Sequence, residues 1–238
     1  MFDFTGRVAL VTGAGGNLGA AVARAFRAAG ARTVLVDREA KRLRQIFADV
    51  QGSPDHLLFG GTDLMAPGEL DGVVAQAVEV FGRLDILVNT VGGFRAGQPL
   101  HETPMETWDM LLDLNLRTTL VAARAVIPTM LAQHYGKIIT IAARAAIVGA
   151  ANMAAYAAAK AAVLRLTESL AAEMKHAGIN VNCVLPGTLD TQQNRQERPD
   201  ADFSKWVTPE AVASVILFLA SDAADAVHGA AVPAYGLT

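Results

Sequence analysis

Residues 7–19, RVALVTGAGGNLG, decide the fold of this chain, because an apolar run of strand length ends in a loop that carries four glycines. An alanine-rich segment of helical character follows the loop. A pyrophosphate can approach the backbone only where Cβ atoms are absent, and the N-terminus of the next helix presents N–H groups and a partial positive charge. The stretch predicts a strand, a phosphate-binding loop and a helix, although a plain tight turn would use the same glycines.

Apolar runs of strand length alternate with longer helical patterns along the rest of the chain. This alternation is typical of βαβ units, so we expect one α/β domain, residues 1–238, built on a doubly wound parallel sheet. A polar, irregular segment at residues 188–207 interrupts the pattern. The predicted strands are residues 7–12, 33–37, 56–60, 84–89, 137–142, 179–185 and about 230–233. The first predicted helix ends at Gly30, the second covers about 39–50, the third begins near Pro67 and the fourth near Pro104. The last two cover 152–176 and about 209–220.

The composition fits a globular protein and argues against several kinds of partner. Hydrophobic residues make up 52% of the 238 residues, enough to bury a sizeable core. The 20 basic and 23 acidic residues give a net charge of -3 without long blocks of either sign, so we expect no nucleic-acid partner. The longest uncharged run, Val8–Ala23, is too short for a membrane span, and the first residues lack the pattern of a secretory signal.

Cysteine and histidine usage points to a reducing compartment and away from metal chemistry. Cys183 is the single cysteine, so no internal disulfide can form, and we expect a cytoplasmic location. The five histidines are scattered without the spacing of metal ligands, so we expect no metal site.

Two carboxylates at strand ends bear on which ligand the glycine loop would hold. Asp37 ends the second predicted strand, about where a carboxylate would accept hydrogen bonds from the hydroxyls of an adenosine ribose. The same charge would repel a 2′-phosphate and favours NAD(H), whereas Arg38 could pair with that phosphate and keeps NADP(H) open. A helix N-cap is the alternative role for Asp37. Asp63, after the third strand, could bind the adenine amino group or close a turn.

Tyr156 and Lys160 are four residues apart on the predicted helix 152–176 and therefore share a face. A free tyrosine has a pKa of about 10, and a neighbouring ammonium stabilises the phenolate and lowers that pKa. The pair thus predicts a tyrosine that serves as a general acid or base; the alternative is a buried tyrosine beside an unrelated surface lysine. Residues 145–159 carry no charge, which suits close packing against a helix or a subunit.

With these motifs in order, the chain resembles the short-chain dehydrogenase/reductase family over essentially its whole length. The resemblance implies an NAD(P)-dependent oxidoreductase with a Rossmann-like fold, which acts on a small molecule as a homodimer or homotetramer. The matching motifs are the glycine loop 12–19, Asp63, the NTVG run 89–92, Asn115, the YAAAK run 156–160, and Pro186 with Gly187.

The same resemblance implies roles for individual residues. Tyr156 would exchange a proton with the substrate, Lys160 would bind the nicotinamide ribose and tune the tyrosine, and Asn115 would help to hold a relay water. The implied cofactor-binding residues are Gly13, Gly15, Gly16, Asn17, Leu18, Gly19, Asp37, Arg38, Asp63, Leu64, Asn89, Gly92, Tyr156, Lys160, Pro186 and Gly187.

Two positions depart from the family pattern. Asn17 takes the place of a glycine in the loop, with Gly16 one place earlier, so we expect a slightly altered loop path. Ala143 takes the place of the family's catalytic serine, and the loss of one aimed donor typically costs on the order of 3 kcal/mol in the transition state. Arg144 could supply a donor instead, but neighbours along a strand point to opposite faces.

The segments VLPGTLDTQQNR (184–195) and PDADFSKW (199–206) resemble those of the dihydropteridine reductases, which reduce quinonoid dihydropterins with NADH and lack the serine. We therefore expect residues 188–207 to cover the substrate, unless they form an ordinary surface loop anchored by aromatics. The alternatives are an alcohol or ketone oxidoreductase, 3-oxoacyl substrates included, and a non-catalytic dinucleotide-binding scaffold. The candidate substrate contacts are Ala143, Arg144, Thr191, Asn194, Phe203 and Trp206.

Overall fold

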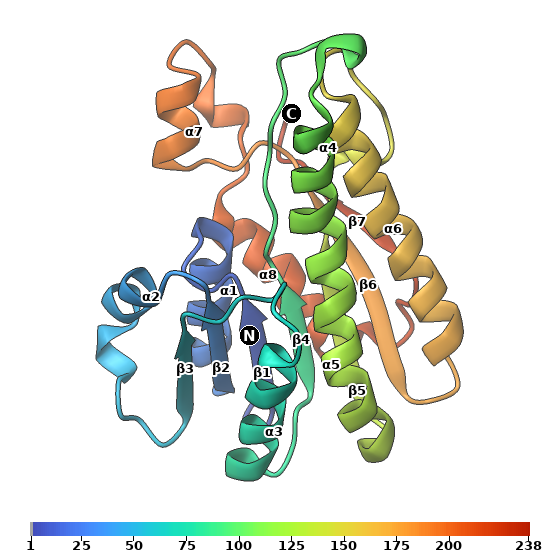
Figure 1. The fold of residues 1–238 in the computed structure, drawn as a ribbon. Coiled ribbons are helices and arrows are strands. Elements are labelled where there is room, and N and C mark those ends of the chain that lie inside the picture. Colours follow the sequence, from blue (N-terminus) through green and yellow to red (C-terminus); the bar gives the residue numbers. More distant parts are fainter. Residues whose placement is uncertain (1) are drawn as a thin grey trace.

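The computed structural model describes residues 2–238 and contains one seven-stranded sheet in which all neighbouring strands are parallel (Figure 1). The strand order, β3-β2-β1-β4-β5-β6-β7, is that of a doubly wound, Rossmann-like sheet and confirms the predicted fold class. The strands are β1 (Val8–Thr12), β2 (Arg32–Asp37), β3 (His56–Gly60), β4 (Ile86–Asn89), β5 (Gly136–Ile141), β6 (Ile179–Pro186) and β7 (Ala231–Ala234).

Helices cover both faces of the sheet and bury its apolar side chains in two layers (Figure 1). The first layer contains α1, α2 and α8, which contribute Phe26, Leu43 and Ile216. The second contains α3, α5 and α6, which contribute residues such as Val73 and Val126. The helices are α1 (Asn17–Ala28), α2 (Ala40–Ile46), α3 (Glu69–Phe81), α4 (Met105–Leu112), α5 (Thr118–Gln133), α6 (Ala154–Met174), α7 (Gln192–Glu197) and α8 (Pro209–Ala220).

Each predicted strand is present, and the differences lie mainly in the connections. Residues 188–207 are not wholly irregular, because they contain the short helix α7 and a bridge between Leu189 and Val207. The chain from Pro104 also does not run as one regular helix. A π-helical turn, Asp113–Arg117, joins α4 to α5. Within residues 2–238, the structure has no helix that is both long and apolar enough to cross a membrane.

The topological switch of the sheet lies between β1 and β4, where the order of the strands reverses. In open sheets of this kind, ligands bind outside the carboxyl ends of the strands at such a reversal. The glycine loop follows β1 and the NTVG run follows β4, so the fold brings two of the predicted motifs to this place.

Paired charges close the opposite, amino-terminal end of the sheet. The carboxylate of Asp85 is fully buried and accepts three hydrogen bonds of 2.6–3.0 Å from Arg83 and one of 2.9 Å from the N–H of Val8. Lys137, only 1% exposed, forms an ion pair with Asp225 and donates to Asn180 Oδ1 at 2.8 Å. These buried charges therefore have partners within the protein.

Candidate active site

The glycine loop turns tightly between β1 and α1 and brings the first turn of the helix against the sheet. Gly13 has a φ of +66°, in the left-handed region that favours glycine. A Cβ atom at Gly19 would lie 2.1 Å from the carbonyl oxygen of Gly13, so only glycine fits there. Gly16 is the N-cap of α1, and the N–H groups of the first helical turn have no carbonyl partner within the helix. These groups fit an anionic pyrophosphate.

The loop's departure from the family pattern has a simple steric explanation. Asn17 is the first residue of α1 and its side chain is exposed, so an asparagine in place of the family's glycine disturbs no packed neighbour. Leu18, the next residue, is buried and lines the central cavity described below. Helix α1 runs to Ala28 and Gly30 has a φ of +84°, as the sequence predicts.

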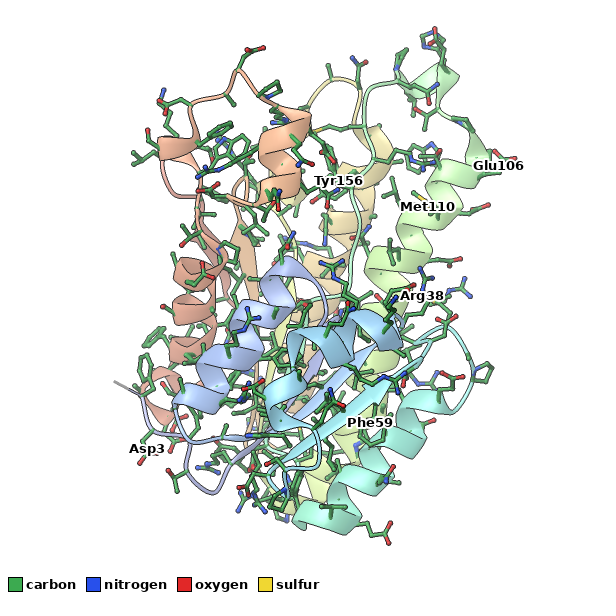
Figure 2. All side chains as sticks on the ribbon, turned by 90° about the vertical axis from the view of Figure 1, so that its left-hand side faces the viewer. Asp3, Arg38, Phe59, Glu106, Met110 and Tyr156 are labelled. Carbon is green, nitrogen blue, oxygen red and sulfur yellow. The ribbon has the colours of Figure 1, made fainter. Side chains whose placement is uncertain are left out.

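Asp37 lies beside the glycine loop with both carboxylate oxygens in use. Its Oδ2 accepts the N–H of Gly15 at 2.8 Å, and its Oδ1 accepts the N–H of Glu39 at 2.8 Å. The carboxylate is thereby fixed next to the loop, and each oxygen keeps a further lone pair for a ligand hydroxyl. Arg38 is exposed, with its Nε 4.0 Å from Glu39 Oε1. Figure 2 shows Arg38 near α2, well below Tyr156 in that view.

Asp63 closes a turn, which is the plainer of its two predicted roles. Its Oδ1 accepts the N–H of Met65 at 2.9 Å, and its carbonyl accepts the N–H of Ala66 at 2.9 Å. Leu64 is buried in the second layer of the core. Neither residue lines the central cavity.

Asn89 lies under the switch point rather than in the cavity. Its amide Nδ2 donates to Thr119 Oγ1 at 2.9 Å, and its Oδ1 accepts the hydroxyl of Thr12 at 2.5 Å. The side chain thus ties β1 and β4 to α5. Its neighbour Thr90 faces the cavity and donates to the carbonyl of Thr12 at 2.7 Å.

Asn115 lies in the π-helical turn between α4 and α5, a kind of distortion often found at functional sites. Its Nδ2 donates to the carbonyls of Gly93 and Leu111, at 3.1 and 2.9 Å, and its Oδ1 accepts the N–H of Gly93 at 3.1 Å. A Cβ atom at Gly92 would lie 2.8 Å from Asn115 Oδ1 and 3.1 Å from Lys160 Nζ. The structure therefore brings Gly92, Asn115 and Lys160 together.

Tyr156 and Lys160 point from α6 toward the same region. Lys160 Nζ lies 6.0 Å from the centre of the Tyr156 ring and donates to the carbonyl of Ile141, at the end of β5, at 3.0 Å. Tyr156 packs against Leu111 of α4, and the ring of Phe94 meets it edge-on at 4.9 Å. Figure 2 shows Tyr156 at the end of the molecule that carries α7, with Met110 of α4 nearby.

Burial changes both pKa values, and for the tyrosine it corrects the expectation from the sequence. The pKa of Tyr156 is raised to about 12, because burial penalises the phenolate. Burial therefore outweighs the effect of the neighbouring ammonium on this pKa. Burial lowers the pKa of Lys160 to about 8, so this side chain is mostly charged at neutral pH. Without ligands, the site therefore holds a neutral phenol beside a cation.

A cavity of about 480 Å³ lies over the carboxyl ends of β4, β5 and β6 and collects some of these groups, whereas the loop glycines, Asp37 and Asn115 do not line it. Tyr156 and Lys160 line it, as do Gly92, Pro186 and Gly187. A cavity of this size accepts a small organic molecule. Within residues 2–238, the structure holds no cluster of histidine, cysteine, aspartate or glutamate that suits a metal ion.

Comparison with known proteins agrees with this geometry. The family model described as "short chain dehydrogenase" matches residues 7–202. This chain is a short-chain dehydrogenase/reductase. Its relatives are oxidoreductases, so the chain is an NAD(P)-dependent oxidoreductase.

Individual relatives resemble this dehydrogenase along nearly its full length. The (2S)-[(R)-hydroxy(phenyl)methyl]succinyl-CoA dehydrogenase subunit BbsD of Thauera aromatica is 35% identical over 232 residues, which cover 94% of this chain and 92% of the relative. The 2-(R)-hydroxypropyl-CoM dehydrogenase of Xanthobacter autotrophicus is 34% identical over 238 residues, with 94% and 95% covered. The crystal structure of gox2181 superimposes with a TM-score of 0.91 at 30% identity and covers 98% of this chain and 96% of its own.

In this dehydrogenase, Ala143 and Arg144 both line the cavity, which corrects the expectation that they face opposite ways. Strand β5 ends at Ile141, and a 3₁₀ turn begins at Arg144, so the alternation of strand residues has already ceased. The guanidinium of Arg144 lies 5.6 Å from the centre of the Tyr235 ring. The cavity wall thus has a methyl group at the family's serine position and a cation next to it.

The candidate contacts in residues 188–207 divide into two groups. Asn194 lines the cavity. Thr191 does not line it and instead caps α7, where its Oγ1 accepts the N–H of Asn194 at 3.1 Å. Phe203 and Trp206 contact each other at 4.9 Å, and neither lines the cavity. Their packing matches the predicted alternative of a loop anchored by aromatics.

Several lining residues of the cavity were not predicted individually, although Thr188 and Arg198 fall within the segment 188–207 that was expected to cover the substrate. Phe94 and Thr188 each follow a predicted motif, the NTVG run and the Pro186–Gly187 pair, by one or two positions. That placement was the available signal, because loops that leave the carboxyl ends of strands form the site in this fold. Arg198 gave no such signal, since only the fold of α7 brings it to the cavity.

Proposed function

We propose that this dehydrogenase reduces a planar conjugated acceptor, with a quinonoid dihydropterin as the leading example and Tyr156 as the proton donor. One observation carries the proposal: the cavity wall offers the phenol of Tyr156 but a methyl group, Ala143, in place of the family's serine. A ketone needs a second donor to polarise its carbonyl. A quinonoid ring is already polarised, so it accepts hydride without that donor.

Residues in and beside the cavity take separate parts in the reaction. A bound nicotinamide would supply the hydride. Tyr156 keeps its proton at neutral pH, because its pKa is about 12, and would give it to a nitrogen of the acceptor. Lys160 would donate to the nicotinamide ribose and stabilise the phenolate left behind. Asn115 Oδ1 accepts one hydrogen bond and keeps a lone pair for a water that returns the proton.

We expect NADH to be preferred to NADPH. The support is Asp37, whose carboxylate is held at the glycine loop by two N–H groups and would repel a 2′-phosphate. Exposed Arg38 beside it is the feature that would let NADPH bind. The remaining predicted contacts of the dinucleotide are Gly13, residues 15–19, Asp63, Leu64, Asn89, Gly92, Tyr156, Lys160 and the pair Pro186–Gly187.

A second candidate is the oxidation of a secondary alcohol or the reduction of a ketone. The names of the two relatives favour it, since each is a dehydrogenase of a hydroxyl-bearing CoA or CoM compound. The cavity would then work without the usual serine hydroxyl, which predicts slow turnover.

Titration with NADH and NADPH, followed by a substrate panel with the tighter dinucleotide, tests the proposal. We expect turnover of quinonoid dihydropterin well above that of small ketones and secondary alcohols. The reverse order would reject the pterin proposal in favour of the second candidate. If no substrate is turned over and Tyr156→Phe leaves dinucleotide binding unchanged, the protein is a dinucleotide-binding scaffold.

We also propose that the enzyme is a homodimer or homotetramer. Leu120 and Leu131 of α5 are about three helical turns apart, so they lie on one face, and their side chains are 38% and 40% exposed. Such a face suits a subunit contact. Light scattering on the purified protein gives the number of subunits, and Leu131→Lys should reduce it.

A further inference from the structure

The cavity carries arginines that have no acidic partner. Arg144 and Arg198 reach it from segments far apart in the sequence, and neither forms an ion pair with any of residues 2–238. Two other arginines differ in this respect. Arg83 is paired with Asp85, and Arg195, on the same helix α7, is held by Asp190 at 2.6 and 2.8 Å.

Arg144 is held in place by contacts that do not neutralise its charge. Its carbonyl accepts the N–H groups of Ile147 and Val148, at 3.0 and 3.2 Å, which fixes the backbone of the turn. Its guanidinium faces the ring of Tyr235 at 5.6 Å, a cation–π contact that orients the side chain. Tyr235 is itself pressed against the end of β6, because a Cβ at Gly187 would lie 2.4 Å from the Tyr235 carbonyl.

Arg198 reaches the cavity from the end of α7. Its N–H donates to the carbonyl of Asn194 at 3.0 Å, so the helix sets its backbone. Glu197, which also lines the cavity, accepts a hydrogen bond from Gln193 at 3.0 Å. With Lys160 included, the side chains that line the cavity carry three cations and one carboxylate, an excess of positive charge.

We propose that Arg144 and Arg198 form an anion subsite, and that the preferred substrate is a carboxylate-bearing derivative of the conjugated acceptor rather than the ring alone. This rests on the proposed function, since it describes a further part of the same substrate. A guanidinium presents paired N–H donors that match the two oxygens of a carboxylate. The subsite holds the acceptor at a second point besides Tyr156, and selects acidic substrates over their neutral esters.

Binding of succinate to the enzyme–NADH complex, followed by nicotinamide fluorescence, tests the subsite without requiring turnover. We expect succinate to bind and dimethyl succinate to bind more weakly. Arg144→Gln and Arg198→Gln should each weaken succinate binding by about 10- to 100-fold and leave the diester unaffected. Arg144→Lys keeps the charge but not the paired donors, so it should fall between the wild type and Arg144→Gln.

Arg24→Gln is the matched control, because Arg24 lies on α1 against Phe47 and does not line the cavity. It should bind succinate like the wild type, and thermal melting of every variant checks that the fold is retained. Equal binding of succinate and its diester, or unchanged binding in both glutamine variants, would overturn the subsite. Charge-dependent binding with no turnover of any substrate would instead reject the proposed function and leave the subsite standing.

Discussion

The two ends of the sheet differ in whether their charged side chains have partners of opposite charge. At the amino end, Asp85 is surrounded by Arg83, Arg7 and a backbone N–H, and Lys137 is paired with Asp225. At the carboxyl end, Lys160 has one carbonyl for a partner and Arg144 has an aromatic ring. Removing one partner of a buried charge that is satisfied within the protein destabilises the fold, whereas a charge without a counterion is available to a ligand.

The largest expected effect is at the carboxyl end. Tyr156→Phe removes the proton donor while keeping the ring that packs against Phe94, so the rate should fall by about 100- to 10,000-fold with NADH binding retained. Steady-state kinetics and a dinucleotide titration measure the two quantities.

Tyr135→Phe is the matched control at the amino end. It removes a hydroxyl that donates to Asp222 at 2.9 Å, and it should leave the rate unchanged. Equal rate losses in the two variants would contradict the proposal that only the carboxyl end of the sheet takes part in the reaction.

Asp85→Ala should produce the largest loss of stability. It leaves two arginines and the Val8 N–H without their carboxylate, and breaking a buried pair costs about 3–5 kcal/mol. Urea denaturation measures the free energy of unfolding. Asp222→Ala, at a side chain that is 65% exposed, should cost less than about 1 kcal/mol. A strong change in the KM of folded Asp85→Ala would mean that the amino end also shapes the site.

Ala143→Ser should have a smaller effect, and its sign depends on the substrate. A hydroxyl at this position would give ketones the donor that the cavity lacks, so ketone reduction should rise by about tenfold. Dihydropterin reduction should change little. Paired kcat/KM measurements on the two substrates test this, and a gain confined to the pterin would contradict the reason given for the missing serine.

The pH profile should show the smallest effect. The pKa of Lys160 is about 8, below its ordinary value of 10.5, so the side chain loses its charge as the pH rises through 8. The rate of reduction should therefore fall above that pH, while Tyr156 stays protonated up to about 12. Lys160→Arg keeps a charge at this position and should remove the fall. A profile that is flat in the wild type would show that the charge is not needed.

The fold was predictable because its signals are local. The glycine loop, the alternation of strands and helices, and the spacing of Tyr156 and Lys160 are each contained in short stretches of sequence. Helix α8 was predicted at its observed bounds, because Thr208 and Pro209 mark its start and the apolar run ends at Ala220.

The electrostatics of the site were less predictable, because they depend on burial. The proximity of Lys160 suggests a lowered pKa for Tyr156, but the side chains from α4 and the Phe94 ring exclude water and raise it. Likewise, the place where β5 ends decides that Arg144 faces the cavity, and strand ends are set by pairing across the sheet.

The π-helical turn at Asp113–Arg117 makes the spacing of this segment intolerant of change. Deleting one residue there would restore an unbroken α-helix and leave α4 and α5 nearly in register, because a π-helical turn holds one residue more than an α-helical turn. The closed turn would move the amide of Asn115 away from the carbonyls of Gly93 and Leu111. Members of the family in which this segment is one residue shorter would therefore need a different support for the loop at Gly93.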